Sequence, residues 1–168
     1  MRNWQDAIAF AARAHAGQLR KDGETPYVAH VYRVMMTVRH VFGCDDEVAL
    51  CAAALHDTIE DTTTDYDNLL DFGPEVAGAV AALTKDARLP EDERENKYDE
   101  VIRAASWQTK LVKLADVYDN LNDAGTSKKP LKAIEKAKRA ITCAGHDERL
   151  KKAIEAVQRL IEQKSTRA

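Results

Sequence analysis

Cysteine is scarce in this sequence and does not occur in pairs. The three cysteines, Cys44, Cys51 and Cys143, are odd in number, far apart and without a CxxC motif. This spacing argues against a disulfide framework and against a cysteine-based zinc knuckle. We therefore expect three packed thiols in a protein of a reducing compartment.

Long apolar runs and an excess of charge of one sign are also missing. No stretch of about 18 apolar residues occurs, and the first residues lack the basic and apolar regions of a secretion signal. The 25 Lys and Arg residues nearly balance the 28 Asp and Glu residues, so the formal net charge is -3. No strong field is expected to attract nucleic acid or an anionic membrane. We predict a soluble, cytoplasmic protein whose oligomeric state the sequence leaves open.

Glycine and proline are few, with 7 and 4 residues among 168, and no segment alternates at the period of a strand. Apolar residues instead recur at the spacing of amphipathic helices, and suitable helix-starting residues are Asp45 or Asp46, Pro74, Ser106 and Asp147. His15 falls on the inner face of the first helix and is expected to be structural. Helices are predicted at residues 4–16, about 30–43, 46–57, 65–72, 74–83, 93–105, 106–121, 130–144 and 147–163. The length is that of one domain, so we predict a single all-α bundle of about eight to ten helices over residues 1–168.

The most informative stretch is His56-Asp57, which closes the apolar run of residues 48–55. Charged groups at the end of a core helix are costly to desolvate unless a cation lies among them. His30 begins an earlier helix, and Asp116 interrupts the apolar stripe of a later one, so both are expected to point inward. These two imidazoles and two carboxylates are candidate metal ligands, in a mixed set that suits Mn, Fe, Ni or Zn.

A metal site of this kind favours hydrolysis of a phosphate ester or anhydride. The cation lowers the pKa of a bound water and offsets charge on a phosphoryl oxygen. Glu60 and Asp61 follow the ligands by one turn and are candidate general bases. Asn120 lies four residues after Asp116, on the same helix face, where its amide can hydrogen-bond a ribose or phosphate.

These residues and their neighbours resemble the HD-domain metal phosphohydrolases. The matching segments are Gly17-Gln18-Leu19-Arg20-Lys21, Thr25-Pro26-Tyr27-Val28-Ala29-His30, Leu55-His56-Asp57-Thr58-Ile59-Glu60-Asp61-Thr62, Leu83-Thr84-Lys85 and Lys113-Leu114-Ala115-Asp116. Together they are similar to the hydrolase domain of the bifunctional Rel/Spo alarmone enzymes, and most of all to the stand-alone small alarmone hydrolases related to metazoan Mesh1. The similarity spans about residues 7–123, with the helices of residues 130–163 beyond it.

The resemblance implies one HD domain that uses a divalent cation, usually manganese, to remove pyrophosphate from the 3′ position of guanosine tetra- or pentaphosphate, (p)ppGpp, giving GDP or GTP. It implies four metal ligands, His30, His56, Asp57 and Asp116. Glu60 and Asp61 would activate the water. Arg20 would stack on the base, Lys21 would attract phosphate, and Asn120 would contact the ribose-phosphate portion.

Three residues depart from the family pattern. Val31 replaces the proline that usually follows the histidine, and Val117 and Asp119 change the segment after Asp116. Asp119 is expected to add negative charge near a pocket that must receive several phosphates. A broader nucleotide phosphohydrolase, such as an NADPH 2′-phosphatase or a deoxynucleotidase, is therefore the alternative hypothesis. A non-catalytic nucleotide-sensing module is a third, opposed by the presence of every ligand and of the Glu-Asp pair.

Overall fold

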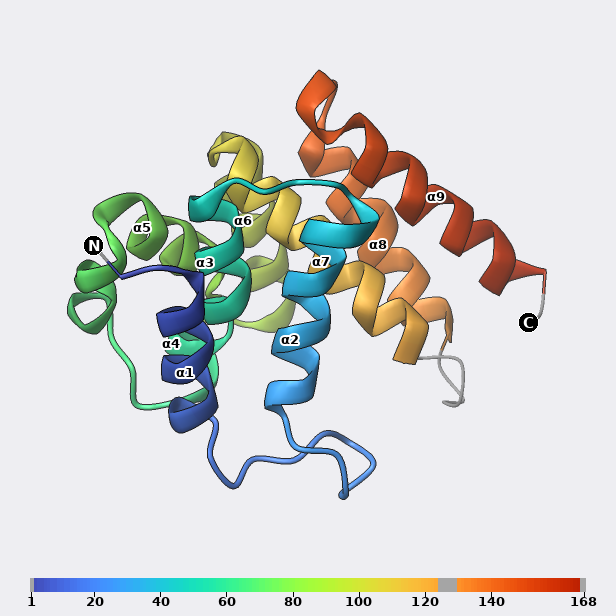
Figure 1. The fold of residues 1–168 in the computed structure, drawn as a ribbon. Coiled ribbons are helices and arrows are strands. Elements are labelled where there is room, and N and C mark those ends of the chain that lie inside the picture. The colour runs from blue at the N-terminus through green and yellow to red at the C-terminus, as the bar shows by residue number, and fades with distance from the viewer. Residues whose placement is uncertain (1, 124–129, 167–168) are drawn as a thin grey trace.

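The computed structural model describes residues 2–123 and 130–166, and in these ranges it contains nine α-helices and no β-strand (Figure 1). The helices are α1 (Trp4–Ala14), α2 (Val28–Met36), α3 (Glu47–Leu55), α4 (Thr58–Asp61), α5 (Pro74–Leu83), α6 (Glu91–Ala104), α7 (Trp107–Asp123), α8 (Pro130–Ala144) and α9 (Lys151–Ser165). Short 3-10 helices cover Asp67–Phe72 and Glu148–Leu150. The all-α prediction is confirmed.

Helix α3 lies at the centre of the bundle and packs against α1, α2, α5 and α7. Every residue from Ala49 to Leu55 is buried, so this helix has no solvent-facing side. Four of its residues are alanines, and such small side chains let neighbouring helices approach closely. Because α3 is fixed on several sides, the residues at its C-terminal end are held in the interior of the protein.

The N-terminal helix boundaries follow from capping residues. Asn3 and Asp6 form a capping box at the start of α1, and Asp46 accepts a hydrogen bond from the backbone N–H of Ala49 at the start of α3. Pro74 occupies the first turn of α5, where its missing N–H has no cost. The start predicted at Pro74 is therefore confirmed, and of the two candidate caps for α3, Asp45 and Asp46, the structure uses Asp46.

The first two predicted helices differ from those observed, and the predicted helix at residues 65–72 is a 3-10 helix over Asp67–Phe72. The first ends at Ala14 rather than at residue 16. The second begins at Val28 and changes at Thr37–Val41 into a π-helical turn, in which the N–H of Phe42 bonds the carbonyl of Thr37. Gly43 then ends the segment with a positive φ of 73°, a backbone conformation that favours glycine.

The C-terminal helices α8 and α9 pack on α7 on one side of the bundle (Figure 1). Most of the turn predicted between α7 and α8 lies outside the described residues. The buried apolar residues form one cluster that extends from Ala7 in α1 to Ile161 in α9. In the described ranges, no helix combines the length and the apolar character needed to cross a membrane.

Candidate metal centre

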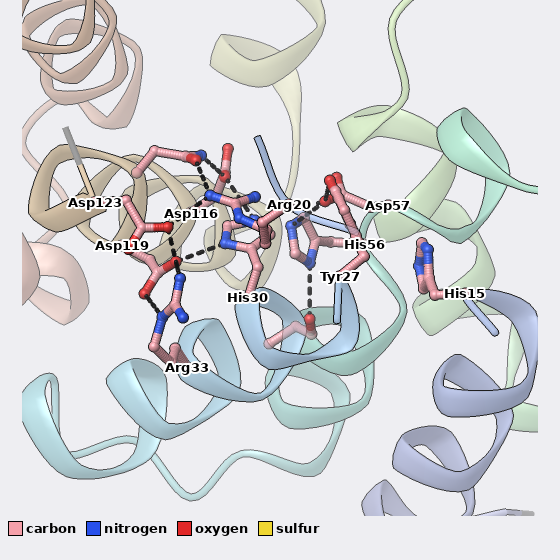
Figure 2. A network of polar contacts seen from close by, with 12 residues as sticks. His15, Arg20, Tyr27, His30, Arg33, His56, Asp57, Asp116, Asp119 and Asp123 are labelled. Atoms are coloured by element: carbon pink, nitrogen blue, oxygen red, sulfur yellow. Dashed lines mark hydrogen bonds and ion pairs between the residues drawn. The ribbon is translucent and has the colours of Figure 1, made fainter. Parts of the chain in front are cut away.

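His30, His56, Asp57 and Asp116 converge from three helices (Figure 2). His30 lies in the first turn of α2, His56 and Asp57 follow the last residue of α3, and Asp116 lies in the middle of α7. Nε2 of His30 is 3.4 Å from Oδ1 of Asp116 and 3.6 Å from Oδ2 of Asp57. Potential ligand atoms of His30, His56 and Asp116 all lie within 4.8 Å of one another. The sequence thus identified four side chains that meet in space.

The state of His56 supports a cation at this point. Its Nδ1 donates to the carbonyl of Ala53 at 2.9 Å, which leaves Nε2 as the nitrogen available to a metal ion. Nε2 is buried and has no hydrogen-bond partner, although Oδ2 of Asp57 lies 3.1 Å away. A buried nitrogen without a partner is costly, and a cation bound to it removes that cost. The donor set therefore fits a divalent metal ion with nitrogen and oxygen ligands.

The turn after α3 is what brings His56 and Asp57 together. Thr58 Oγ1 donates to the carbonyl of Leu55 at 2.7 Å, and α4 begins directly at Thr58. His56 and Asp57 are the two residues between α3 and α4, and His56 is buried whereas Asp57 is half-buried. The same turn places Glu60 and Asp61 on α4, next to the ligands.

Electrostatic effects keep the two carboxylates ionised. Burial would raise the pKa of Asp57, but the charge of His56 outweighs it and lowers this pKa to about 2. Burial is likewise overcome at Asp116, where Lys113, 2.8 Å away on the same helix, holds the pKa well below its usual range. Burial would lower the pKa of His30, but hydrogen bonds to Asp116 and Asp119 raise it to about 9. The two carboxylates therefore stay ionised in the metal-free protein, and they favour positive charge on the groups between them.

Glu60 and Asp61 are both exposed at the site. Oε2 of Glu60 accepts a 3.0 Å hydrogen bond from the backbone N–H of Lys85, which fixes the carboxylate. Although the residue as a whole is exposed, desolvation of its carboxylate raises the pKa of Glu60, and the charges of Asp57 and Asp61 add to that effect. The backbone carbonyl of Asp61 accepts a 2.6 Å hydrogen bond from Gln18.

Of the three residues expected to contact a nucleotide, two are linked by hydrogen bonds to the candidate ligand Asp116. Asn120 donates to Oδ1 of Asp116 at 2.5 Å, so the predicted shared face of α7 is observed. Arg20 donates to Oδ1 of Asn120 at 3.2 Å and to Asp123 at 2.8 Å, with its guanidinium 5.5 Å from the centre of the Tyr27 ring. Lys21 is exposed in the loop before α2, and no contact of its side chain with other described residues links it to the cluster.

A family model described as HD domain matches residues 7–142. A human protein named guanosine-3′,5′-bis(diphosphate) 3′-pyrophosphohydrolase MESH1 is 46% identical over 120 residues, which cover 70% of this chain and 67% of that protein. Its Xenopus tropicalis counterpart is 43% identical with the same coverage. The chain belongs to the HD-domain family, among the relatives of MESH1.

Structural similarity agrees with this assignment to the MESH1 relatives. The solved structure of a metazoan orthologue of SpoT, reported to hydrolyse ppGpp, has a TM-score of 0.82 and 31% identity. That match covers 95% of this chain and 94% of the other. The likeness therefore extends past the motif-bearing residues into the C-terminal helices of this HD domain.

Two side chains of this HD domain that the sequence analysis did not assign to the site lie beside it. The hydroxyl of Tyr27 donates to Oδ2 of Asp57 at 2.7 Å, and His15 stacks on Tyr27 with ring centres 4.9 Å apart. His15 was expected to be structural, and it is buried, with Nδ1 hydrogen-bonded to Gln18. Tyr27 lies one helical turn before His30, and this spacing is the sequence feature that could have placed Tyr27 at the site.

The departures from the family pattern have structural explanations. Val31 and Val117 are buried in the apolar core. Asp119 was expected to add charge near the nucleotide pocket, but it is buried behind His30 and accepts hydrogen bonds from His30 and Arg33. Asp119 thus lies beside the candidate site, as expected, and the guanidinium of Arg33 balances its charge.

Proposed function

We propose that this HD domain, as a single domain over residues 1–168, is a metal-dependent pyrophosphohydrolase that acts on (p)ppGpp. Water would attack the phosphorus attached to the 3′ oxygen, and the bond between that phosphorus and the 3′ oxygen would break. The products would be pyrophosphate and GDP or GTP. The observation that carries the proposal is the convergence of His30, His56 and Asp116, with Asp57 beside both imidazoles, in a relative of MESH1.

The cation would be held by His30, His56, Asp57 and Asp116, and manganese is our choice among the divalent ions that suit nitrogen and oxygen ligands. When bound, such an ion supplies Lewis-acid stabilisation of phosphoryl charge and lowers the pKa of a bound water. Nε2 is the ligand atom expected of His56, since its Nδ1 is engaged by Ala53. Tyr27 and Lys113 hold the two carboxylates by hydrogen bonds and so limit their movement.

Glu60 is the proposed general base, with Asp61 assisting it. A general base works best when its pKa lies close to the working pH, and the pKa of Glu60 is raised in that direction. The hydrogen bond from the Lys85 N–H orients one carboxylate oxygen, which leaves the other to accept a proton from water. Asp61 adds negative charge beside Glu60, which favours proton uptake.

Arg20, Lys21 and Asn120 are the proposed nucleotide contacts. Arg20 lies between Tyr27 and the end of α7, where its planar guanidinium is held by Asn120 and Asp123. A planar cation fixed in this way is suited to stacking on a base or to pairing with a phosphate. Lys21 extends from the same loop into solvent, as expected of a side chain that meets an incoming anion.

Activity assays with purified protein test the proposal. With Mn²⁺ and guanosine 3′,5′-bis(diphosphate), we expect stoichiometric release of pyrophosphate and GDP. Parallel assays with NADPH and with deoxynucleoside triphosphates test the broader phosphohydrolase alternative, and a preference for either would reject the alarmone assignment. Binding of Mn²⁺ and nucleotide without turnover of any substrate would favour the sensing module instead.

A pair of variants separates metal binding from chemistry. Asp57→Ala is expected to abolish both Mn²⁺ binding and turnover. Glu60→Gln should keep Mn²⁺ binding and lower kcat by about 10²–10⁴-fold, the usual contribution of a general base. Unchanged kcat in Glu60→Gln would remove Glu60 from the proposed role.

A further inference from the structure

His30 lies between carboxylates on both edges of its ring (Figure 2). Nε2 faces Asp57 and Asp116, the other members of the proposed metal site. Nδ1 lies 2.6 Å from Oδ2 of Asp119, on the opposite edge of the ring. Asp119 is one helical turn past Asp116, so α7 contacts both edges of the same imidazole.

Asp119 is held in place by Arg33. Nε of Arg33 donates to Oδ1 of Asp119 at 2.6 Å, and Nη2 donates to Oδ2 at 3.0 Å. Such a two-point contact between guanidinium and carboxylate is stronger and more directional than a single hydrogen bond. Arg33 also donates to Asp123 at 2.7 Å. The charge of the buried Asp119 is therefore balanced, and its orientation is fixed from the α2 side.

A carboxylate that accepts the Nδ1 proton of a histidine fixes the ring and leaves Nε2 as the ligand atom. We infer that Asp119 is a positioning residue that presents Nε2 of His30 to the cation and strengthens metal binding. This inference rests on the proposed metal-dependent function. It concerns metal affinity, however, so it can fail while the hydrolase proposal stands.

The two histidines of the site differ in the group that accepts the Nδ1 proton. Nδ1 of His56 donates to the neutral carbonyl of Ala53, whereas Nδ1 of His30 faces an ionised carboxylate. A negatively charged acceptor makes the imidazole a stronger electron donor than a neutral one does. His30 is therefore the better metal ligand of the pair, and its strength depends on Asp119.

The first test compares Mn²⁺ affinity in Asp119→Asn and in wild-type protein by isothermal titration calorimetry. The asparagine keeps the size of the side chain but loses the charge. We expect Kd to rise about 10- to 100-fold, the usual effect of removing an outer partner of a metal ligand. Asp99→Asn is the matched control, because Asp99 is a half-buried carboxylate that also pairs with an arginine, Arg139, between α6 and α8. Its Kd should not change.

An Mn²⁺ affinity in Asp119→Asn equal to that of wild type would overturn the inference, as would an equal loss in Asp99→Asn. Wild-type protein that binds no Mn²⁺ would overturn both this inference and the proposed function. Wild-type protein that binds Mn²⁺ but does not turn over ppGpp would overturn only the proposed function. Thermal unfolding of the metal-free variants shows whether a change in Kd accompanies a loss of fold.

The second test uses no Asp119 variant. It therefore still tests the role of Asp119 if Asp119→Asn does not fold. In wild-type protein loaded with Zn²⁺, which gives no paramagnetic broadening, nitrogen NMR shifts report which ring atom binds the metal. His30, assigned by its absence in His30→Gln, is expected to carry the proton on Nδ1 and the metal on Nε2. Metal bound through Nδ1, or a proton on neither nitrogen, would contradict the role of Asp119.

Discussion

The hydroxyl of Tyr27 donates a 2.7 Å hydrogen bond to Oδ2 of Asp57, the same oxygen that lies 3.1 Å from Nε2 of His56. Tyr27 lies just before α2, and Asp57 lies in the turn between α3 and α4. Their contact links the loop that carries Arg20 to the proposed metal site. The loop and the site are therefore expected to respond together when this hydrogen bond is removed.

Tyr27→Phe should weaken metal binding without unfolding the protein. The ring contacts with His15 and His30 remain, and only the hydrogen bond that orients Asp57 is lost. We expect Kd for Mn²⁺ to rise about tenfold, at the low end for a group that orients a ligand. Calorimetric titration measures this change. Tyr66→Phe, at an exposed tyrosine that is neither a proposed ligand nor a hydrogen-bond partner of one, should leave Kd unchanged, and equal effects of both variants would contradict the assigned role.

Mn²⁺ affinity should rise with pH. The pKa of His30 is raised to about 9, so below that pH a proton occupies the site in the metal-free protein. Binding must displace this proton, because a protonated nitrogen cannot be a ligand. The sign follows directly: lower pH favours the protonated form and weakens binding, by about tenfold per pH unit for each displaced proton. Titrations in two buffers of different ionisation enthalpy measure proton release, and no release below about pH 9 would contradict the prediction.

The acidic limb of the pH profile of kcat should report Glu60. Its carboxylate is the active form of a general base, so activity falls as pH drops through its pKa. This pKa is raised, in part by the charge of Asp61, and the fall should begin at a higher pH than for an ordinary glutamate. Asp61→Asn removes that charge and should move the limb to lower pH, whatever its effect on the maximal rate. A limb that stays in place would exclude coupling between the two residues.

Core packing around α7 should dominate the stability of the fold. Leu114→Ala removes a fully buried side chain beside the proposed ligand Asp116, and we expect a loss of about 2–5 kcal/mol in the free energy of unfolding. Urea denaturation of the metal-free protein measures this loss. Leu131→Ala is the matched control, because Leu131 is 75% exposed in α8 and its truncation should change stability by less than about 0.5 kcal/mol. Similar losses in the two variants would contradict the observed core.

The helices were largely predictable because their causes are local. Asp46 and Pro74 mark helix starts through interactions with residues within one turn, and the start of α8 at Pro130 was also predicted. The π-helical turn at Thr37–Val41 was missed, since a shift from four- to five-residue hydrogen bonding leaves the apolar spacing nearly unchanged. Local signals therefore fixed where helices form but not their finer geometry.

The candidate ligands could be named from sequence because their types are distinctive and their surroundings are apolar. A buried histidine or carboxylate needs a partner, and four of them, His30, His56, Asp57 and Asp116, in segments that match one family pattern favour a shared cation. The sequence by itself thus determined the helical class, the family resemblance and which side chains are candidate ligands. These depend on residue type and on spacing along the chain.

Only the tertiary structure decided how those ligands are supported. Asp119 and Arg33 are separated by 86 residues, and neither carries a local signal for its contact with His30. The carboxylate of Asp119 is buried, pairs with the guanidinium of Arg33 and lies 2.6 Å from Nδ1 of His30. The reason is physical: the contacts that orient a side chain come from whichever helices pack around it, and that packing is a property of the whole bundle rather than of any segment.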